Sequence, residues 1–200
     1  MTNKRKLERF YKKKGAKFVY HLFELAPLMM TKEVFDISSV LFTDNPFNTI
    51  EPDGNITGWD AALSSYEADE CGCCVTRYGY DTGEIRAYGI YVFIDKVTEF
   101  TLSVYNDSDI KLFNGNIIDY FLHSLAHTFF HELYHICDNN NKEIINHIDR
   151  YDNDIEYNTK TENRVNEKAS CFMSDHYDEI FNGYMPDYKG VIQEWHMYID

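Results

Sequence analysis

Two histidines four residues apart, with a glutamate directly after the first, stand in the segment His131-Glu132-Leu133-Tyr134-His135. Residues four apart in a helix share one face and lie about 6 Å apart along its axis, so both imidazoles can reach one metal ion. The H-E-x-x-H pattern is typical of zinc sites whose glutamate serves as general base. We therefore expect His131 and His135 to bind Zn²⁺. Glu132 is expected to take a proton from the zinc-bound water.

The helix that must position these residues is indicated by apolar residues spaced three and four apart, from about Ile117 to Cys137. They are Ile118, Leu122, Leu125, Phe129, Leu133 and Ile136. This stripe centres about 160° from His131, so we expect the histidines to face a cleft or solvent while the opposite side packs. His123 and His127 continue the four-residue spacing. Both are expected to face solvent, although His127 could also support the metal ligands.

A catalytic zinc site normally has a third protein ligand. Glu162 and Glu167 lie on a second long helix, predicted from about Thr159 to beyond His176. Glu162 shares a face with Val165, Asn166, Ala169 and Met173, whereas Glu167 projects among polar residues. Glu162 is the better candidate, and Glu167 stays open. As an alternative role, Thr159 and Glu162 could form a capping box at the start of that helix.

The two motifs together resemble those of the small gluzincins, and most closely the ImmA/IrrE-type metallopeptidases of phages and mobile elements. The second motif of that family reads E-x-x-A-N-x-F-A. Here Glu162, Asn166 and Ala169 match, Val165 stands for the first alanine, and Lys168 stands for the phenylalanine. The resemblance covers roughly residues 85–177. It implies the ligand set His131, His135 and Glu162, and a small sheet whose edge strand lines the substrate cleft.

Alternating patterns between Cys73 and Tyr105 predict an antiparallel meander of strands near 73–80, 90–95 and 100–105, with a turn at Asp81-Thr82-Gly83. Residues 3–14 and 17–25 are predicted to be helical, separated at Gly15, and 43–58 to be a loop. The expected fold is α+β and zincin-like, with the sheet packed on the H-E-x-x-H helix and the second helix. Residues 1–58 would form a helical appendage with a basic arm, and 59–200 the metallopeptidase core.

The net charge is −14, yet residues 1–17 carry eight lysines and arginines against one glutamate. The acidic remainder argues against an extended nucleic-acid surface, although the basic arm leaves contact with nucleic acid, anionic lipid or the acidic body of the protein open. We expect the arm to be a solvated helix or a frayed end. No segment is long and apolar enough to span a membrane. The odd count of 5 cysteines and the lack of an export signal favour the cytoplasm. Cys71, Cys73 and Cys74 are expected to be ordinary thiols rather than a metal site.

The sequence therefore predicts a zinc metallopeptidase that hydrolyses peptide bonds of a cytosolic protein partner. His176, which shares a face with Glu162, is a candidate for stabilising the oxyanion, and Tyr157 and Tyr134 are weaker ones. Ordinary packing is the favoured role of all three. The alternative function is a non-catalytic zincin-fold binding module or a phage effector. The intact Glu132 favours catalysis, because zinc binding alone does not require it.

Overall fold

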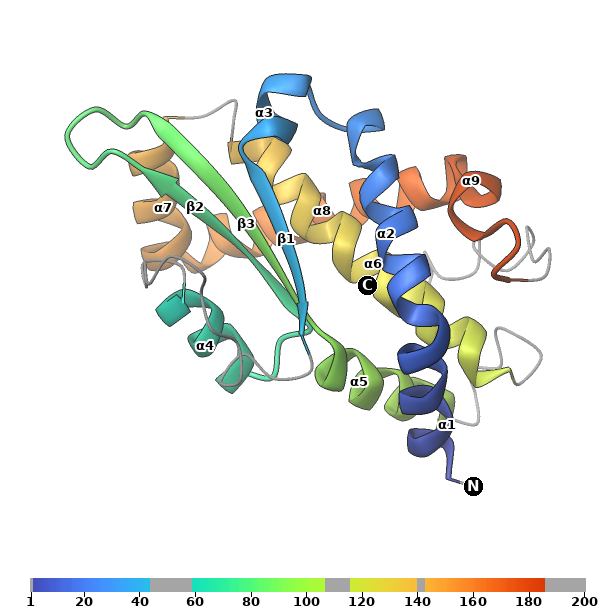
Figure 1. Ribbon diagram of the computed structural model, residues 1–200. Coiled ribbons are helices and arrows are strands. Elements are labelled where there is room, and N and C mark those ends of the chain that lie inside the picture. Colours follow the sequence, from blue (N-terminus) through green and yellow to red (C-terminus); the bar gives the residue numbers. More distant parts are fainter. Residues whose placement is uncertain (1, 44–58, 107–115, 140–142, 186–200) are drawn as a thin grey trace.

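The computed structural model describes residues 2–43, 59–106, 116–139 and 143–185 (Figure 1). Helices and strands alternate irregularly along the chain, and the fold is mixed α+β, as predicted. The first half contains α1 (Asn3–Phe10), the π-helix η1 (Tyr11–Gly15), α2 (Ala16–Leu25), the 3₁₀ turn η2 (Ala26–Leu28), α3 (Lys32–Asp36), β1 (Ser38–Thr43), α4 (Trp59–Glu67), β2 (Gly72–Tyr78) and β3 (Ile85–Phe93). The second half contains α5 (Ile94–Asn106), α6 (Ile117–Asn139), α7 (Ile144–Asn153), α8 (Ile155–Asp175) and α9 (Tyr177–Phe181).

The sheet of the described residues is mixed rather than antiparallel, with strand order β1-β3-β2. The hairpin of β2 and β3 is confirmed: its strands pair antiparallel from Gly72 opposite Val92 to Tyr78 opposite Ile85. The predicted turn lies between them, where the Gly79 N–H donates to the Glu84 carbonyl at 2.8 Å. β1 was not predicted, and it pairs parallel to β3.

The third predicted strand, residues 100–105, is wrong, because this segment belongs to α5. Ile94, Val97 and Thr101 are buried at helical spacing. The Thr98 and Thr101 hydroxyls donate to carbonyls four residues earlier, both at 2.7 Å. Threonines can therefore lie inside the helix without unpaired hydroxyls.

The N-terminal helices are continuous through Gly15 rather than separated there. Gly15 ends the π-helix with helical backbone angles. A Cβ at this position would lie 2.3 Å from the Tyr11 ring, so glycine leaves the space that the ring fills. The Tyr11 ring in turn packs edge-on against Phe121 of α6, with centroids 6.3 Å apart.

Residues 2–43 are not a separately packed appendage. Leu7, Phe18 and Leu22 are fully buried in the cluster that also contains the core of α6 and β3, and β1 completes the sheet. Apart from Thr43, the loop predicted at 43–58 lies outside the described residues, as does the proposed boundary at residue 58.

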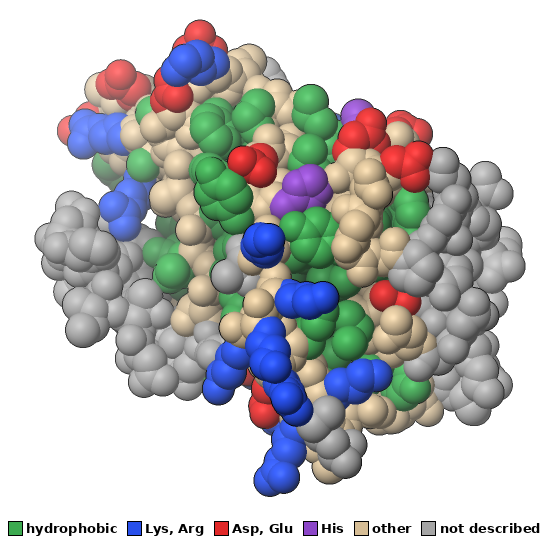
Figure 2. Space-filling view, turned by 45° about the vertical axis from the view of Figure 1, so that its right-hand side comes forward, with side chains coloured by type: hydrophobic (Ala, Val, Ile, Leu, Met, Phe, Trp, Pro, Cys, Tyr) green, Lys and Arg blue, Asp and Glu red, His purple; other side chains and the backbone are tan. Residues whose placement is uncertain are grey.

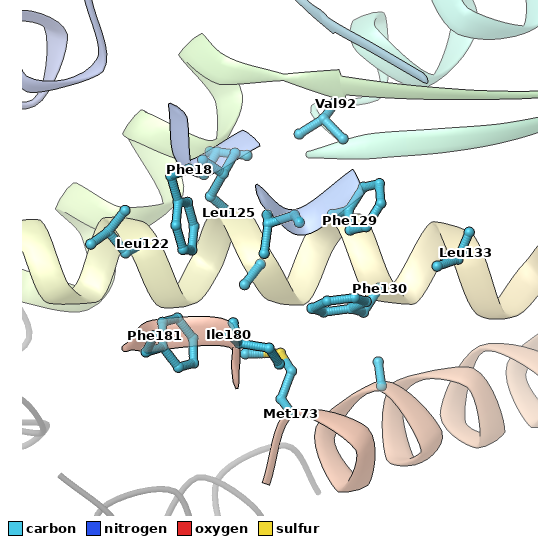
Figure 3. Packing of buried hydrophobic residues seen from close by; sticks show 14 of the residues in the cluster. Phe18, Val92, Leu122, Leu125, Phe129, Phe130, Leu133, Met173, Ile180 and Phe181 are labelled. Atoms are coloured by element: carbon cyan, nitrogen blue, oxygen red, sulfur yellow. The ribbon is translucent and has the colours of Figure 1, made fainter. Parts of the chain in front are cut away.

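Helix α6 confirms the predicted long helix and is the centre of the core. Figure 3 shows its side chains packing against Phe18 of α2, Val92 of β3 and Met173 of α8. The other face of the sheet packs on α4 through a smaller cluster that contains Ala62, Val75 and Phe93. Because neighbours cover α6 on several sides, its burial extends well beyond the predicted stripe.

The polar residues of α6 are consequently more buried than expected. His123 is 3% exposed and its ring stacks on Phe181, so the prediction that it faces solvent is wrong. Burial disfavours the charged imidazolium and lowers the pKa of His123 to about 3.

The lysines and arginines of α1 and η1 are mostly exposed, as expected of a solvated helix. Figure 2 shows blue side chains gathered in the lower part of the face that it presents. Among the described residues, no helix has the length and apolarity needed to cross a bilayer.

We predict that His123→Phe removes part of the acid sensitivity of the fold. An unfolded histidine has a pKa of about 6.5, so in the wild type the unfolded chain binds a proton there that the folded chain does not bind. The free energy of unfolding of the wild type should therefore fall, relative to the variant, by about 1.4 kcal/mol per pH unit below pH 6. Urea unfolding of both proteins at pH 7, 6, 5 and 4.5 measures this difference. A difference that stays constant with pH would contradict the buried neutral histidine.

Candidate metal centre

Helix α6 presents His131 and His135 on the side that faces α8. Their side chains are 14% and 12% exposed, so they lie between the two helices rather than in open solvent. The predicted separation of the histidines from the packed stripe is thus only partly correct. The sequence pattern located the polar side of α6, and the second helix, which was predicted to turn Glu162 toward it, covers this side.

Helix α8 supplies Glu162 to the same space. The helix begins at Ile155, and its N-cap is Asp154, whose carboxylate accepts from the Tyr157 N–H at 3.0 Å. Glu162 therefore lies in the interior of the helix, and the capping box with Thr159 is not formed. With no capping role, the Glu162 carboxylate is available to the histidines.

The three side chains converge on one point. The Nε2 atoms of His131 and His135 are 3.1 Å apart. The Glu162 carboxylate places Oε2 at 3.2 Å from Nε2 of His131 and Oε1 at 3.2 Å from Nε2 of His135. Among the described residues, this is the group of histidine, cysteine and acidic side chains that could hold a metal ion.

These separations fit a zinc ion. In a tetrahedral site with bonds of about 2.0–2.1 Å, neighbouring ligand atoms lie about 3.3 Å apart. The donors are two imidazole nitrogens and a carboxylate, which zinc prefers, and three protein ligands leave a fourth position open. An open fourth position is what distinguishes catalytic zinc sites from closed structural ones.

The chain matches no family model, no curated protein and no solved structure. The interpretation of the site therefore rests on its residues and their geometry.

Two further side chains hold the cluster in place. Nδ1 of His131 lies 2.8 Å from Oδ1 of Asn166, so the ring donates there and its Nε2 is left for a metal. The Tyr151 hydroxyl of α7 donates to Oε1 of Glu162. Asn166 was recognised in the second motif, whereas Tyr151 was missed. A signal for it existed, because Ile144, His147 and Tyr151 recur at spacings of three and four.

The cluster is electrostatically coupled. Burial disfavours the charge on both His131 and Glu162, but the hydrogen bonds and opposite charges of the cluster together outweigh it. The pKa of His131 is therefore raised and that of Glu162 is lowered. The cluster thus holds a proton on His131 more tightly than a free imidazole would, and a metal ion would have to displace that proton.

Glu132 is buried beside the cluster, with 6% exposure. Burial raises the pKa of its carboxyl, while the charges of His131 and His135 oppose that rise. A carboxylate with a raised pKa is a stronger proton acceptor, which suits a general base.

A close approach of β2 creates the environment of Glu132. A Cβ on Gly72 would lie 2.8 Å from the Tyr91 carbonyl oxygen, 2.9 Å from Thr128 Cγ2 and 3.3 Å from Glu132 Cγ. Only glycine allows this edge strand to lie so near the middle of α6.

The other predicted site residues fall outside the cluster. Glu167 is exposed, as expected, which favours Glu162 as the third ligand. His127 lies 3.3 Å from the Ser170 hydroxyl, with its ring 6.3 Å from that of His131. Tyr157 contacts His147 through its hydroxyl at 2.8 Å. His176 packs on Phe172, and fourteen residues along a helix place it about 21 Å from Glu162.

The C-terminal end of α6 is tied to α8 by ion pairs. Asp138 bonds to Arg164, and its other oxygen lies 3.5 Å from Lys168 Nζ. The lysine that departs from the family motif thus helps to hold the two ligand-bearing helices together. Tyr134, a weaker oxyanion candidate, lies under the Lys168 ammonium and edge-on to Phe172.

We predict that Gly72→Ala destabilises the fold by about 1–3 kcal/mol, because the new Cβ meets a backbone oxygen that cannot move aside. Gly89→Ala is the matched control on β3, where the nearest atoms are 3.5 Å or farther from the added Cβ. It should change stability by less than about 0.5 kcal/mol. Urea unfolding of both variants measures the difference. Equal effects would show that β2 is not closely packed on α6.

We predict that Glu162→Ala weakens zinc binding on the order of 100-fold or more, because it removes one of three ligands. Glu167→Ala should bind as the wild type does, since that side chain is exposed. Competition with a fluorescent chelator, together with elemental mass spectrometry, measures affinity and stoichiometry. The reverse ranking would assign the third ligand to Glu167.

Proposed function

We propose that the protein is a zinc-dependent metallopeptidase. The observation that carries this proposal is the triangle of His131, His135 and Glu162, with donor atoms 3.1–3.2 Å apart and the buried Glu132 next to it. A zinc-binding module would need the triangle alone. The additional carboxylate with a raised pKa is what hydrolysis requires.

A zinc ion bound at the triangle would supply Lewis acidity, which acidifies a water molecule and polarises a carbonyl group. The chain's own residues do the rest. His131 and His135 use their Nε2 atoms as ligands, and Asn166 keeps the His131 proton on Nδ1. Glu132 accepts the proton of the attacking water and passes it to the leaving amine, so the carboxylate is regenerated after each cycle.

The sheet suggests how a peptide reaches the site. In the described sheet β2 has β3 as its partner on one side and lies at the edge. Gly72, its first residue, lies against Glu132. An extended peptide that pairs with β2 would pass the general base, and strand addition at an exposed edge is a common mode of peptide recognition. We therefore propose a protein or peptide substrate.

The family assignment to the gluzincins and the cytoplasmic location remain part of this proposal. All five cysteines are free thiols, which suits a reducing compartment such as the cytoplasm.

Glu132→Gln should retain zinc and lose cleavage by at least about 100-fold, because the amide cannot accept the proton. We would incubate zinc-loaded wild type and variant with a proteome-derived peptide library and identify new termini by mass spectrometry. Zinc content of both proteins is the control. If zinc-loaded wild type produces no more new termini than the variant, the protein is not a peptidase under these conditions and the binding-module function would be favoured. Absence of zinc after reconstitution would remove the metal centre itself.

A further inference from the structure

Helix α7 brings a side chain to the metal centre that neither motif contains. Its inner side carries Ile144 and His147, which are 3% and 6% exposed, and Tyr151 one turn later. The Tyr151 hydroxyl donates to Oε1 of Glu162. Its ring lies edge-on to His135, with centroids 6.2 Å apart and planes at 87°. Tyr151 therefore contacts two of the three candidate ligands.

Tyr151 is itself held against α8. The Asn158 side-chain amide donates to its backbone carbonyl at 3.2 Å. One turn earlier, His147 contacts the Tyr157 hydroxyl at 2.8 Å, and Arg150 lies over the Tyr157 ring. These contacts fix α7 on the first turns of α8, so the position of the Tyr151 hydroxyl relative to Glu162 is set by the fold.

The bond distinguishes the two oxygens of Glu162. Oε1 accepts the Tyr151 hydrogen bond and lies 3.2 Å from Nε2 of His135, whereas Oε2 lies 3.2 Å from Nε2 of His131. A carboxylate can bind a metal through one oxygen or two, and a hydrogen bond to one oxygen favours ligation through the other.

We propose that Tyr151 is a positioning residue that orients Glu162 so that its Oε2 serves as the single carboxylate ligand of the zinc ion. This inference rests on the proposed metal centre. It adds to the three ligands a residue that affects their affinity for zinc. Outer partners of metal ligands typically alter metal affinity 10–100-fold when removed.

The test compares Tyr151→Phe with Tyr157→Phe in the full chain. Each variant loses one hydroxyl from the α7–α8 contact: that of Tyr151 bonds to Glu162, and that of Tyr157 contacts His147. We expect Tyr151→Phe to weaken zinc binding about 10-fold and Tyr157→Phe to change it less than about 2-fold. In the cobalt-substituted proteins, the visible absorption bands should shift in Tyr151→Phe alone, because its Glu162 is free to use both oxygens.

A double-mutant cycle with Glu162→Gln separates positioning from general stabilisation of the fold. If Tyr151 acts through the Glu162 carboxylate, Tyr151→Phe should have no further effect on the weakened zinc affinity of Glu162→Gln. A purely structural tyrosine would lower affinity equally in both backgrounds, and that result would overturn the proposal. Should Tyr151→Phe fail to fold, Asn158→Ala serves in its place. This variant removes the bond to the Tyr151 backbone carbonyl, so it should also weaken zinc binding.

The outcomes for the two proposals differ. Wild type without zinc would remove the metal centre and the proposed function together with this inference. Zinc-loaded wild type with unchanged affinity and spectra in Tyr151→Phe would overturn only the role of Tyr151.

Discussion

The packing of α6 against α8 is the constraint on which the rest of the structure depends. α6 is buried on several sides, so His131 and His135 can be kept in the interior only if another element offers them polar partners. α8 does so with Glu162 and Asn166, and the ion pairs of Asp138 tie the helix ends together. The sheet closes the remaining side, because Gly72 lets β2 approach Glu132.

Much of this arrangement could be predicted from local patterns. The length of α6, the β2–β3 hairpin and the inward direction of Glu162 follow from periodicity within single segments, and the structure contains all three. The H-E-x-x-H segment could also be interpreted locally, because residues four apart in any helix lie on the same face, as His131 and His135 do. Most of the errors occur where the outcome depends on a distant partner.

Three of these errors have identifiable physical causes. β1 is stabilised by parallel pairing with β3, about fifty residues away, and its own sequence shows little of that pairing. Residues 100–105 alternate like a strand, yet Thr101 lies inside a helix because it donates to its own backbone. The inner face of α7 carries Ile144, His147 and Tyr151. Because two of these three residues are not aliphatic, a search for apolar periodicity alone does not identify Tyr151 as an inward-facing residue.

The charges at the candidate metal centre explain why its acidic and histidine side chains must lie next to one another. Glu132 and Glu162 bring up to two negative charges into a space where the histidines are 12–14% exposed, which is costly without compensation. In the metal-free protein, protons help to compensate this charge, because the pKa values of His131 and Glu132 are both raised. A divalent cation would neutralise the same two carboxylates and release the proton of His131. Zinc affinity should therefore weaken as the pH falls through the raised pKa of His131, because a proton and the metal ion compete for the same buried imidazole.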